Sequence, residues 1–336
     1  MKELLFRLCN EAFIGNVRTA ADVAKNELST FCDKVYSDLT GSVYGTIKGD
    51  SDYTIMLEAH IDEIGFIVTN VDKGGFVRVN KVGGIDIRTL PSTPVIVHGT
   101  KKIRGVFTST PPHLQKGDNK EFSDLDEIYI DTGKKDADRY IKNGDFVTFD
   151  IEPCELNNGY VTSKSLDDRS GCVAVIDAAK RLSKENLPVS IVVALLSGEE
   201  LGNRGAKIGA FATNANEAIA VDVSFAASPG APTHQCGECE KGAMLGISPI
   251  LSNDVTNTLK KIADENGIKY QTEVMGSTTS TDADVITITK CGIPCGLLSI
   301  PLKYMHTPIE TINIDDIRSV SDLMYHYVKD GGIYNA

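Results

Sequence analysis

The chain has 336 residues, of which 41 % are hydrophobic and 24 % are charged, values that are typical of a globular protein and exclude a disordered or fibrous chain. No stretch approaches the roughly 20 apolar residues of a membrane-spanning helix, so we expect no membrane partner. The 34 basic and 46 acidic side chains leave a net charge of −12. This charge repels phosphate backbones, and we therefore expect no nucleic-acid partner.

The N-terminal segment predicts an amphipathic helix. Leu4, Leu5, Leu8 and Phe13 recur at helical spacing with charged residues between them, a pattern that differs from that of a signal peptide. We therefore expect a cytoplasmic protein.

The eight cysteines favour free thiols over disulfides, because they are spread through a long chain without an export signal. An alternative is a zinc site in which the pair Cys236 and Cys239 combines with Cys291 and Cys295.

The first elements in chain order are a helix over Thr19 to Phe31 and an apolar strand over Tyr53 to Glu58. From Val68 to Thr162, short β-type runs alternate with turns, a pattern that is typical of a small β-barrel or sandwich. The segment Pro111 to Asp124 lacks periodicity and predicts a long exposed loop. The β-type runs are Phe76–Val79, Pro94–Val97, Ile103–Phe107, Ile128–Ile130 and Phe146–Phe149.

After Val161 the pattern alternates between helices and strands, and runs such as SIVVALL predict strands buried on both faces. We expect an α/β domain formed by residues 1–67 and 161–336, with a β-rich domain inserted at 68–160. The predicted helices are Ser170–Leu182, Gly205–Phe211, Asp254–Asn266, Asp282–Lys290 and Asp315–Val328, and the predicted strands are Ser190–Leu196, Ala218–Val221 and Gly296–Ile300.

Histidines and carboxylates follow several of these strands, where open α/β sheets place their ligand sites. His60 and Asp62 come after the first apolar strand. An imidazole is a good ligand for zinc-like metals, and a nearby carboxylate commonly orients it. The alternative interpretation is a solvated histidine at a strand end.

Two pairs of adjacent carboxylates add to this pattern. Asp167 and Asp168 precede a helix, where one carboxylate can bridge two cations, although helix capping alone would also explain the pair. Glu199 and Glu200 follow a fully apolar strand, and their burial is costly unless a cation neutralises them. One glutamate would ligate a metal while its neighbour accepts a proton from water.

Asp222 and His306 complete the set, since each lies at or after the end of a further apolar strand. Together these side chains supply enough ligands for two metals that share one carboxylate. Each position also has a simpler explanation as an exposed strand end or a loop residue.

Several longer motifs occur in a common order and cover nearly the whole chain: AHIDEIGF, KVGGID, PPHL, IDTG…IKNGDFVTF, SLDDRSG, SGEELGNRGA, AVDVS, TDA and YMHTPIET. In these motifs the chain resembles the co-catalytic metallo-aminopeptidases called glutamyl or deblocking aminopeptidases, of the tetrahedral (TET) type. The resemblance implies a mixed-sheet α/β/α zinc-peptidase-like catalytic domain with an inserted small β-barrel or sandwich. It also implies a homo-oligomer, a dodecamer, whose contacts come from the inserted domain.

The resemblance further assigns roles to individual residues. It implies two divalent metal ions, zinc in the first place, with cobalt or manganese as alternatives. Glu199 would be the general base, and Asp62 the carboxylate that orients His60. One metal would be held by His60, Asp167 and Asp222 and the other by Asp167, Glu200 and His306.

Two segments depart from the family pattern, namely Ser280 to Asp284 around TDA and the turn at Asn10 to Gly15. Neither includes an expected ligand, so we expect them to affect substrate preference. The expected activity is the removal of N-terminal residues from short peptides that have a free N-terminus.

Three alternatives remain at this point. A carboxypeptidase, dipeptidase or deacylase would use the same two-metal scaffold, although many of these insert an α+β lid. A glycoside hydrolase also uses paired carboxylates, but it does not require the histidines, and the chain has no Trp for sugar stacking. A non-enzymatic metal-binding protein would be expected to have lost Glu199.

Overall fold

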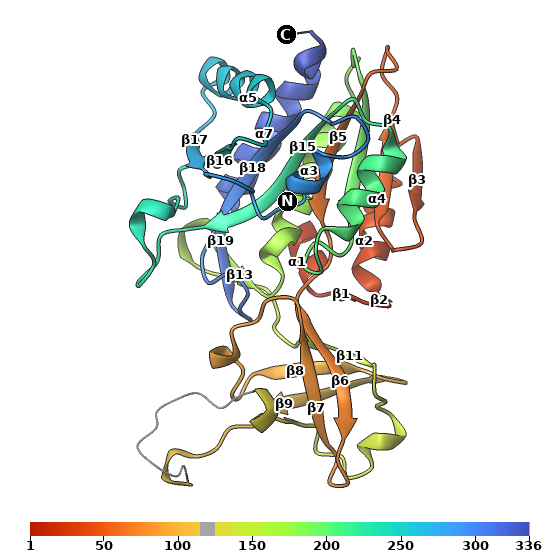
Figure 1. Cartoon of the computed structure of the whole chain (residues 1–336), viewed down its shortest axis with the longest axis vertical. Helices are drawn as coiled ribbons and strands as arrows, with labels where there is room; N and C mark the ends of the chain where they lie inside the picture. Colours follow the sequence, from red (N-terminus) through yellow and green to blue (C-terminus); the bar gives the residue numbers. More distant parts are fainter. Residues whose placement is uncertain (115–124, 336) are drawn as a thin grey trace.

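The computed structural model describes residues 1–114 and 125–335. Figure 1 shows a large part of helices and strands at the top and a smaller barrel below it. The expected mixed α/β fold with an additional small β-barrel is therefore confirmed. Most of the loop predicted at Pro111 to Asp124 lies outside the described residues.

An eight-stranded mixed sheet forms the centre of the larger part. The four central strands run parallel to one another, and every residue of β14 is buried. Such strands must be apolar on both faces, which explains the unbroken run SIVVALL. The order is β17 (Tyr270–Val274), β16 (Ala243–Ile247), β18 (Cys295–Leu302), β15 (Glu217–Phe225), β5 (Thr54–His60), β14 (Ser190–Leu196), β4 (Val43–Ile47) and β3 (Lys34–Ser37).

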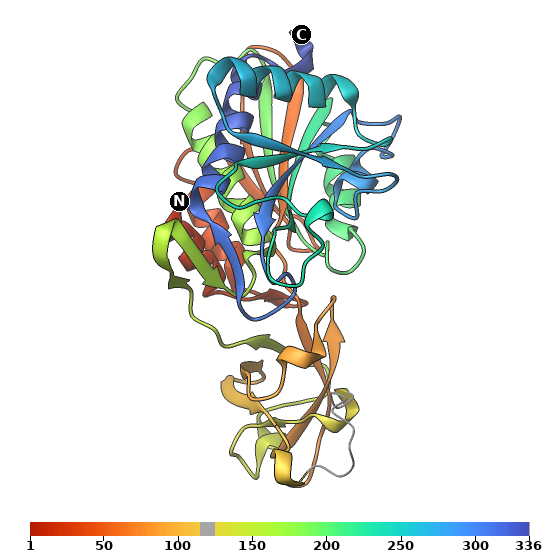
Figure 2. The same cartoon turned by 90° about the vertical axis from the view of Figure 1, so that its left-hand side faces the viewer.

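Helices cover both faces of this sheet, as Figure 2 shows in a side view. On one face, Ile55 and Leu57 of β5 belong to a hydrophobic cluster that includes side chains from five helices. On the other face, Met56 of the same strand packs against two shorter helices. The first layer contains α1 (Lys2–Cys9), α2 (Thr19–Leu28), α3 (Leu166–Leu182), α5 (Asn253–Asn266) and α7 (Ile314–Lys329), and the second contains α4 (Arg204–Thr213) and α6 (Ala283–Ile286).

The barrel has its own hydrophobic core. Phe66 contacts Phe107 and Phe149, with ring centroids 4.9 and 5.6 Å apart. Its strands, in order around the barrel, are β10 (Ile130–Asp131), β7 (Phe76–Val82), β6 (Gly65–Val71), β11 (Phe146–Phe149), β8 (Pro94–His98) and β9 (Lys102–Phe107).

Two small sheets lie outside the main sheet and the barrel. One is a hairpin, and the other pairs a strand that follows the barrel with the strand before α7. Their strands are β1 (Phe13–Ile14) and β2 (Val17–Arg18), and β12 (Cys154–Glu155), β13 (Tyr160–Ser163) and β19 (Glu310–Asn313).

Some predicted elements need correction. The helix predicted over Asp282–Lys290 is limited to α6, because the run Ile286-Thr287-Ile288-Thr289 is β-branched and disfavours further helix. Phe13 lies in β1 and not on the face of α1. The sequence interpretation also missed β16 and β17. The YQTEV segment of β17 is a half-exposed edge strand, which explains its weak apolar signal.

Candidate metal centre and active site

The predicted site residues lie together at the carboxyl ends of the central strands. β5 ends at His60, and parallel pairing places His60 beside Leu196, the last residue of β14. The loop after β14 therefore brings Glu199 and Glu200 close to His60. Asp222 comes from β15, on the other side of β5. This agrees with the expectation that a ligand site forms at this edge of the sheet.

A first group of side chains that could hold a metal ion contains His60, Asp167 and Asp222, which are all buried. The Nε2 atom of His60 lies 2.9 Å from Oδ1 of Asp167 and 3.9 Å from Oδ1 of Asp222. Asp167 reaches this position from the irregular first turn of α3, where the backbone is not yet helical.

A second group contains Asp167, Glu200 and His306. The Nε2 atom of His306 lies 3.4 Å from Oδ2 of Asp167 and 3.5 Å from Oε1 of Glu200. Asp167 thus presents one oxygen to each histidine. Asp168, its neighbour in the sequence, has a different role, since its Oδ1 accepts a hydrogen bond from the Gly171 amide.

Asp62 and Glu199 lie beside these two groups. Oδ1 of Asp62 is 3.5 Å from Nδ1 of His60 and accepts a hydrogen bond of 3.2 Å from the Glu199 backbone amide. His60, Glu199 and Glu200 also form a third possible metal group. Geometry therefore leaves two roles open for Glu199, those of a base and of a ligand.

A buried carboxylate that the sequence interpretation did not assign fixes the backbone at two of these positions. Glu310, which is fully buried, accepts hydrogen bonds from the Asp167 amide (3.1 Å) and from the His306 amide (2.9 Å). The signal for this residue is its position in the motif YMHTPIET, four residues after His306.

A buried ion-pair cluster fixes the start of α3. Both carboxylate oxygens of Glu63 are used: one accepts from Lys164 (2.6 Å) and the other from the Phe13 amide (2.9 Å) and from Arg169 (3.5 Å). Arg169 also donates to the Leu8 carbonyl in α1. The cluster therefore ties the N-terminal helix and β1 to the turn that carries Asp167.

The carboxyl groups of the site repel one another. Burial and the nearby charge of Asp167 raise the pKa of Glu200 to about 8. Burial raises the pKa of Glu199 to about 7, and it also raises the pKa of Asp222 well above its usual range. Proximity to the histidines has the opposite effect on Asp167, whose pKa is lowered despite its burial.

This donor set fits divalent cations of the zinc type. Such ions take imidazole nitrogens and carboxylate oxygens as ligands, and two cations would neutralise the carboxylates that burial otherwise forces to hold protons. The eight cysteines are all free. Within residues 1–114 and 125–335, none of them belongs to a group that can hold a metal.

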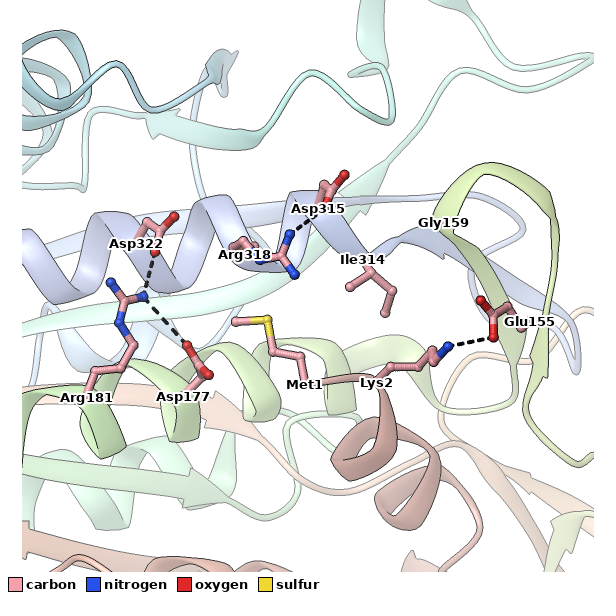
Figure 3. A pocket seen from close by; sticks show the side chains of 10 residues that line it. All are labelled: Met1, Lys2, Glu155, Gly159, Asp177, Arg181, Ile314, Asp315, Arg318 and Asp322. Atoms are coloured by element: carbon pink, nitrogen blue, oxygen red, sulfur yellow. Dashed lines mark hydrogen bonds and ion pairs between the residues drawn. The ribbon is translucent and has the colours of Figure 1, made fainter.

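Two cavities differ in their position relative to the site and in the charged side chains that line them. One of about 350 Å³ lies beside Asp62, between the β1–β2 hairpin and the loop after β14. Another of about 530 Å³, drawn in Figure 3, lies between α1, α3 and α7. The charged side chains of the second cavity neutralise one another, as with Arg181 and Asp322 (2.6 Å) or Arg318 and Asp315 (2.7 Å). These ion pairs occupy most of the charged side chains that line the second cavity.

Comparisons with known proteins show what the chain as a whole is similar to. The family model described as M42 glutamyl aminopeptidase matches residues 41–323. A lysyl aminopeptidase from Pyrococcus furiosus is 32 % identical over 307 residues, which cover 88 % of this chain and 87 % of the relative.

Solved structures show the same similarity over the whole chain. An aminopeptidase from the archaeon Desulfurococcus kamchatkensis superimposes with a TM-score of 0.92 and 30 % identity, covering 98 % of this chain and 94 % of that chain. The Pyrococcus horikoshii TET1 peptidase, which can assemble into a tetrahedron or a large octahedral shell, gives 0.85 and 30 %, covering 97 % and 98 %. In the described part of this chain, no helix is long and apolar enough to cross a membrane.

Proposed function

We propose that this chain, which belongs to the M42 glutamyl aminopeptidase family, binds one divalent metal through His60, Asp167 and Asp222 and a second through Asp167, Glu200 and His306. The chain is a metal-dependent aminopeptidase. The observation that supports the ligand assignment most directly is Asp167, whose two oxygens face one histidine each, as a bridging carboxylate requires.

The metals would polarise the scissile carbonyl, bind the free α-amine of the peptide and lower the pKa of the attacking water. Zinc is the first choice because two imidazoles and three carboxylates suit it, with cobalt and manganese as alternatives.

In this proposal Glu199 is the general base. Its carboxylate would accept the proton of the attacking water and return it to the leaving amine. Burial raises the pKa of Glu199 to about 7 without bound metal, and two neighbouring cations would lower it and favour the ionised form that accepts a proton. Asp62 would hold the His60 ring by accepting its second N–H.

The substrates would be short peptides with a free N-terminus, because an uncharged amine can coordinate a metal whereas an acylated one cannot. We propose that residues 68–160 form a domain for assembly and access, inserted between the two segments 1–67 and 161–336 of the catalytic domain. The assembly would be a homo-oligomer of twelve subunits in the cytoplasm. Its shell would admit peptides and exclude folded proteins.

The activity can be tested with aminoacyl chromogenic amides beside their N-acetylated forms. We expect cleavage of the free amides only, loss of activity on chelation, and recovery when zinc, cobalt or manganese is added back. Equal release of the chromophore from the N-acetylated forms would show that no free α-amine is required and would contradict the proposed N-terminal specificity. Full turnover of verified metal-free protein would contradict the two-metal mechanism.

A further inference from the structure

Three polar side chains follow one another in a series that begins next to Glu199, and none of them has a part in the reaction described above. They are Asn203 from the loop before α4, Asp282 from the residue before α6, and Glu58 from β5. Asp282 is 3 % exposed and Glu58 is fully buried. Polar groups at this depth are costly to bury and call for an explanation.

The amide of Asn203 connects Glu199 to Asp282. Its Nδ2 donates one hydrogen bond of 3.1 Å to Oε1 of Glu199 and a second of 3.0 Å to Oδ1 of Asp282. Both acceptors are carboxylate oxygens, so only the NH₂ group of the amide can face them.

Helix capping does not account for this side chain. Asn203 occupies the N-cap position of α4, yet its side chain accepts no capping hydrogen bond from the helix. Its backbone has a φ of 58°, a left-handed conformation that asparagine and glycine tolerate better than other residues. The backbone therefore explains the residue type in part, and the side chain serves another purpose.

At the end of this connection that is away from Glu199, Asp282 lies beside the buried Glu58. In the sheet, Glu58 is paired with Ala194 on one side and with Ala220 on the other. These small side chains leave room for a second carboxyl group beside Glu58. Among the described residues, no group donates a hydrogen bond to either carboxyl oxygen of Glu58, and Oδ2 of Asp282 also has no partner, although the two carboxyl groups lie close enough to affect each other's pKa. Asp282 therefore lies buried next to Glu58, and its hydrogen bond from Asn203 is the side-chain contact that connects it to Glu199.

We propose that Asn203 is a positioning residue, which holds the Glu199 carboxylate in the orientation that accepts the proton of water and is itself anchored on Asp282. A glutamate side chain has several rotatable bonds, and a small displacement of a catalytic group can lower the rate by about 10²-fold. The inference rests on the role of Glu199 as the base proposed above. It also gives Asp282, the central residue of the TDA motif, a link to catalysis.

Two substitutions distinguish the contribution of the Asn203 side chain from that of its backbone conformation. Asn203→Asp keeps the size of the side chain but replaces the NH₂ donor by an oxygen that repels both carboxylates. Asn203→Gly removes the side chain and keeps the left-handed backbone accessible. The matched control is Asn214→Gly at the other end of α4, where the asparagine also has a positive φ (55°) and contacts Lys290.

We expect both Asn203 variants to lower kcat by at least about 10-fold with KM changed less than about 2-fold, since the base acts in the chemical step. The metal content should stay equal to that of the unmodified protein, and the absorption spectrum of the cobalt-loaded form should not change, because no proposed ligand is altered. Asn214→Gly should leave kcat unchanged.

A double-variant cycle completes the test. If Asn203 acts through Glu199, adding Asn203→Asp to Glu199→Gln should cause little further loss of kcat. Unchanged kcat in both Asn203 variants, or a loss of metal that parallels the loss of kcat, would overturn the inference. If Glu199→Gln itself retained full turnover, the assignment of the base would fail first, so the two failures are distinguishable.

Discussion

Glu199 and Asp167 lie within a few ångströms of the same histidine, yet we expect their replacement to have different effects. Glu199→Gln preserves shape but cannot accept a proton, so turnover should fall by about 10²–10⁴-fold with both metals retained. Asp167→Ala removes the shared ligand and should release metal. Metal analysis of the purified variants checks both. Equal depletion in the two variants would show that Glu199 is a ligand, as the third metal group allows.

Asp62 provides a second test at the level of single residues. Asp62→Asn keeps a side chain of the same size 3.5 Å from His60 but removes the charge that orients the ring. We expect metal affinity or activity to fall by about 10–100-fold, the usual effect of removing a carboxylate that supports a metal-bound histidine. Calorimetric titration of metal into the apoprotein measures the affinity. Full affinity together with full activity would exclude the orienting role.

At the level of single residues, the sequence predicted which side chains form the candidate site. It did not predict which other residues hold those side chains in position. His60, Asp222 and Glu200 each lie at or just after an apolar strand, and the carboxyl ends of parallel strands meet at one edge. Asn203 and Asp282 contact each other from loops 79 residues apart. Neither residue has a local pattern that reveals this pairing, so the sequence interpretation missed their link to Glu199.

At the scale of elements, the buried cluster around Glu63 joins α1, β1 and the start of α3. Glu63→Gln keeps an oxygen acceptor but leaves Lys164 and Arg169 as buried cations without a counter-charge. We expect the free energy of unfolding to fall by about 3–5 kcal/mol. Urea denaturation at equal subunit concentration measures the change.

An exposed ion pair of equal length is the matched control for Glu63. Lys2 and Glu155 are also 2.6 Å apart, but both are well exposed. Glu155→Gln should change the free energy of unfolding by no more than about 1 kcal/mol. If the two substitutions had the same effect, the buried cluster would not be what holds these elements together.

We expect acid to lower the stability of the barrel, and we expect His98 of β8 to cause part of this loss. Burial lowers the pKa of His98 to about 4, and its ring lies 2.9 Å from the hydroxyl of Thr148. In the unfolded chain this histidine binds a proton near pH 6.5. The contribution of the neutral His98 ring to the free energy of unfolding is therefore complete above that pH and is lost as the pH falls towards 4. Thermal unfolding between pH 7.5 and 4.5 should therefore show a smaller loss of Tm for His98→Gln than for the unmodified protein. His326→Gln, in α7, is the control and should behave like the unmodified protein.

The central strands of the sheet could be predicted from the sequence, whereas the edge strand β17 and the end of α6 could not. β14 is buried along its whole length, so its apolar run identified it with the observed bounds. β17 lies at the edge of the sheet with alternating partly buried and exposed residues, and its polar sequence resembles a loop. α6 is short because β-branched residues follow it, although the predicted helix continued to Lys290. Burial alone does not decide the outcome, since β16 is buried at four of its five positions and was also missed, whereas the longer apolar run of β14 was identified.

At the scale of the whole molecule, the barrel takes up a large share of the chain without contributing any of the proposed ligands. It has a separate hydrophobic core, so it does not depend on the metal centre for its fold. A part of the chain with its own hydrophobic core could provide contacts to other subunits without involving the catalytic sheet. The TET1 peptidase, which shares the fold at a TM-score of 0.85, can assemble into a tetrahedron or a large octahedral shell.

We therefore expect light scattering on the native, metal-loaded protein at micromolar concentration to give about twelve times the subunit mass of 36.2 kDa. Deleting the barrel should reduce the particle to a much smaller species, because the proposed contacts lie there. A mass of one or two subunits for the native protein would rule out the shell. In that case access to the metals would depend on the cleft of a single subunit, and cleavage of short peptides would no longer be favoured over attack on the exposed N-termini of folded proteins.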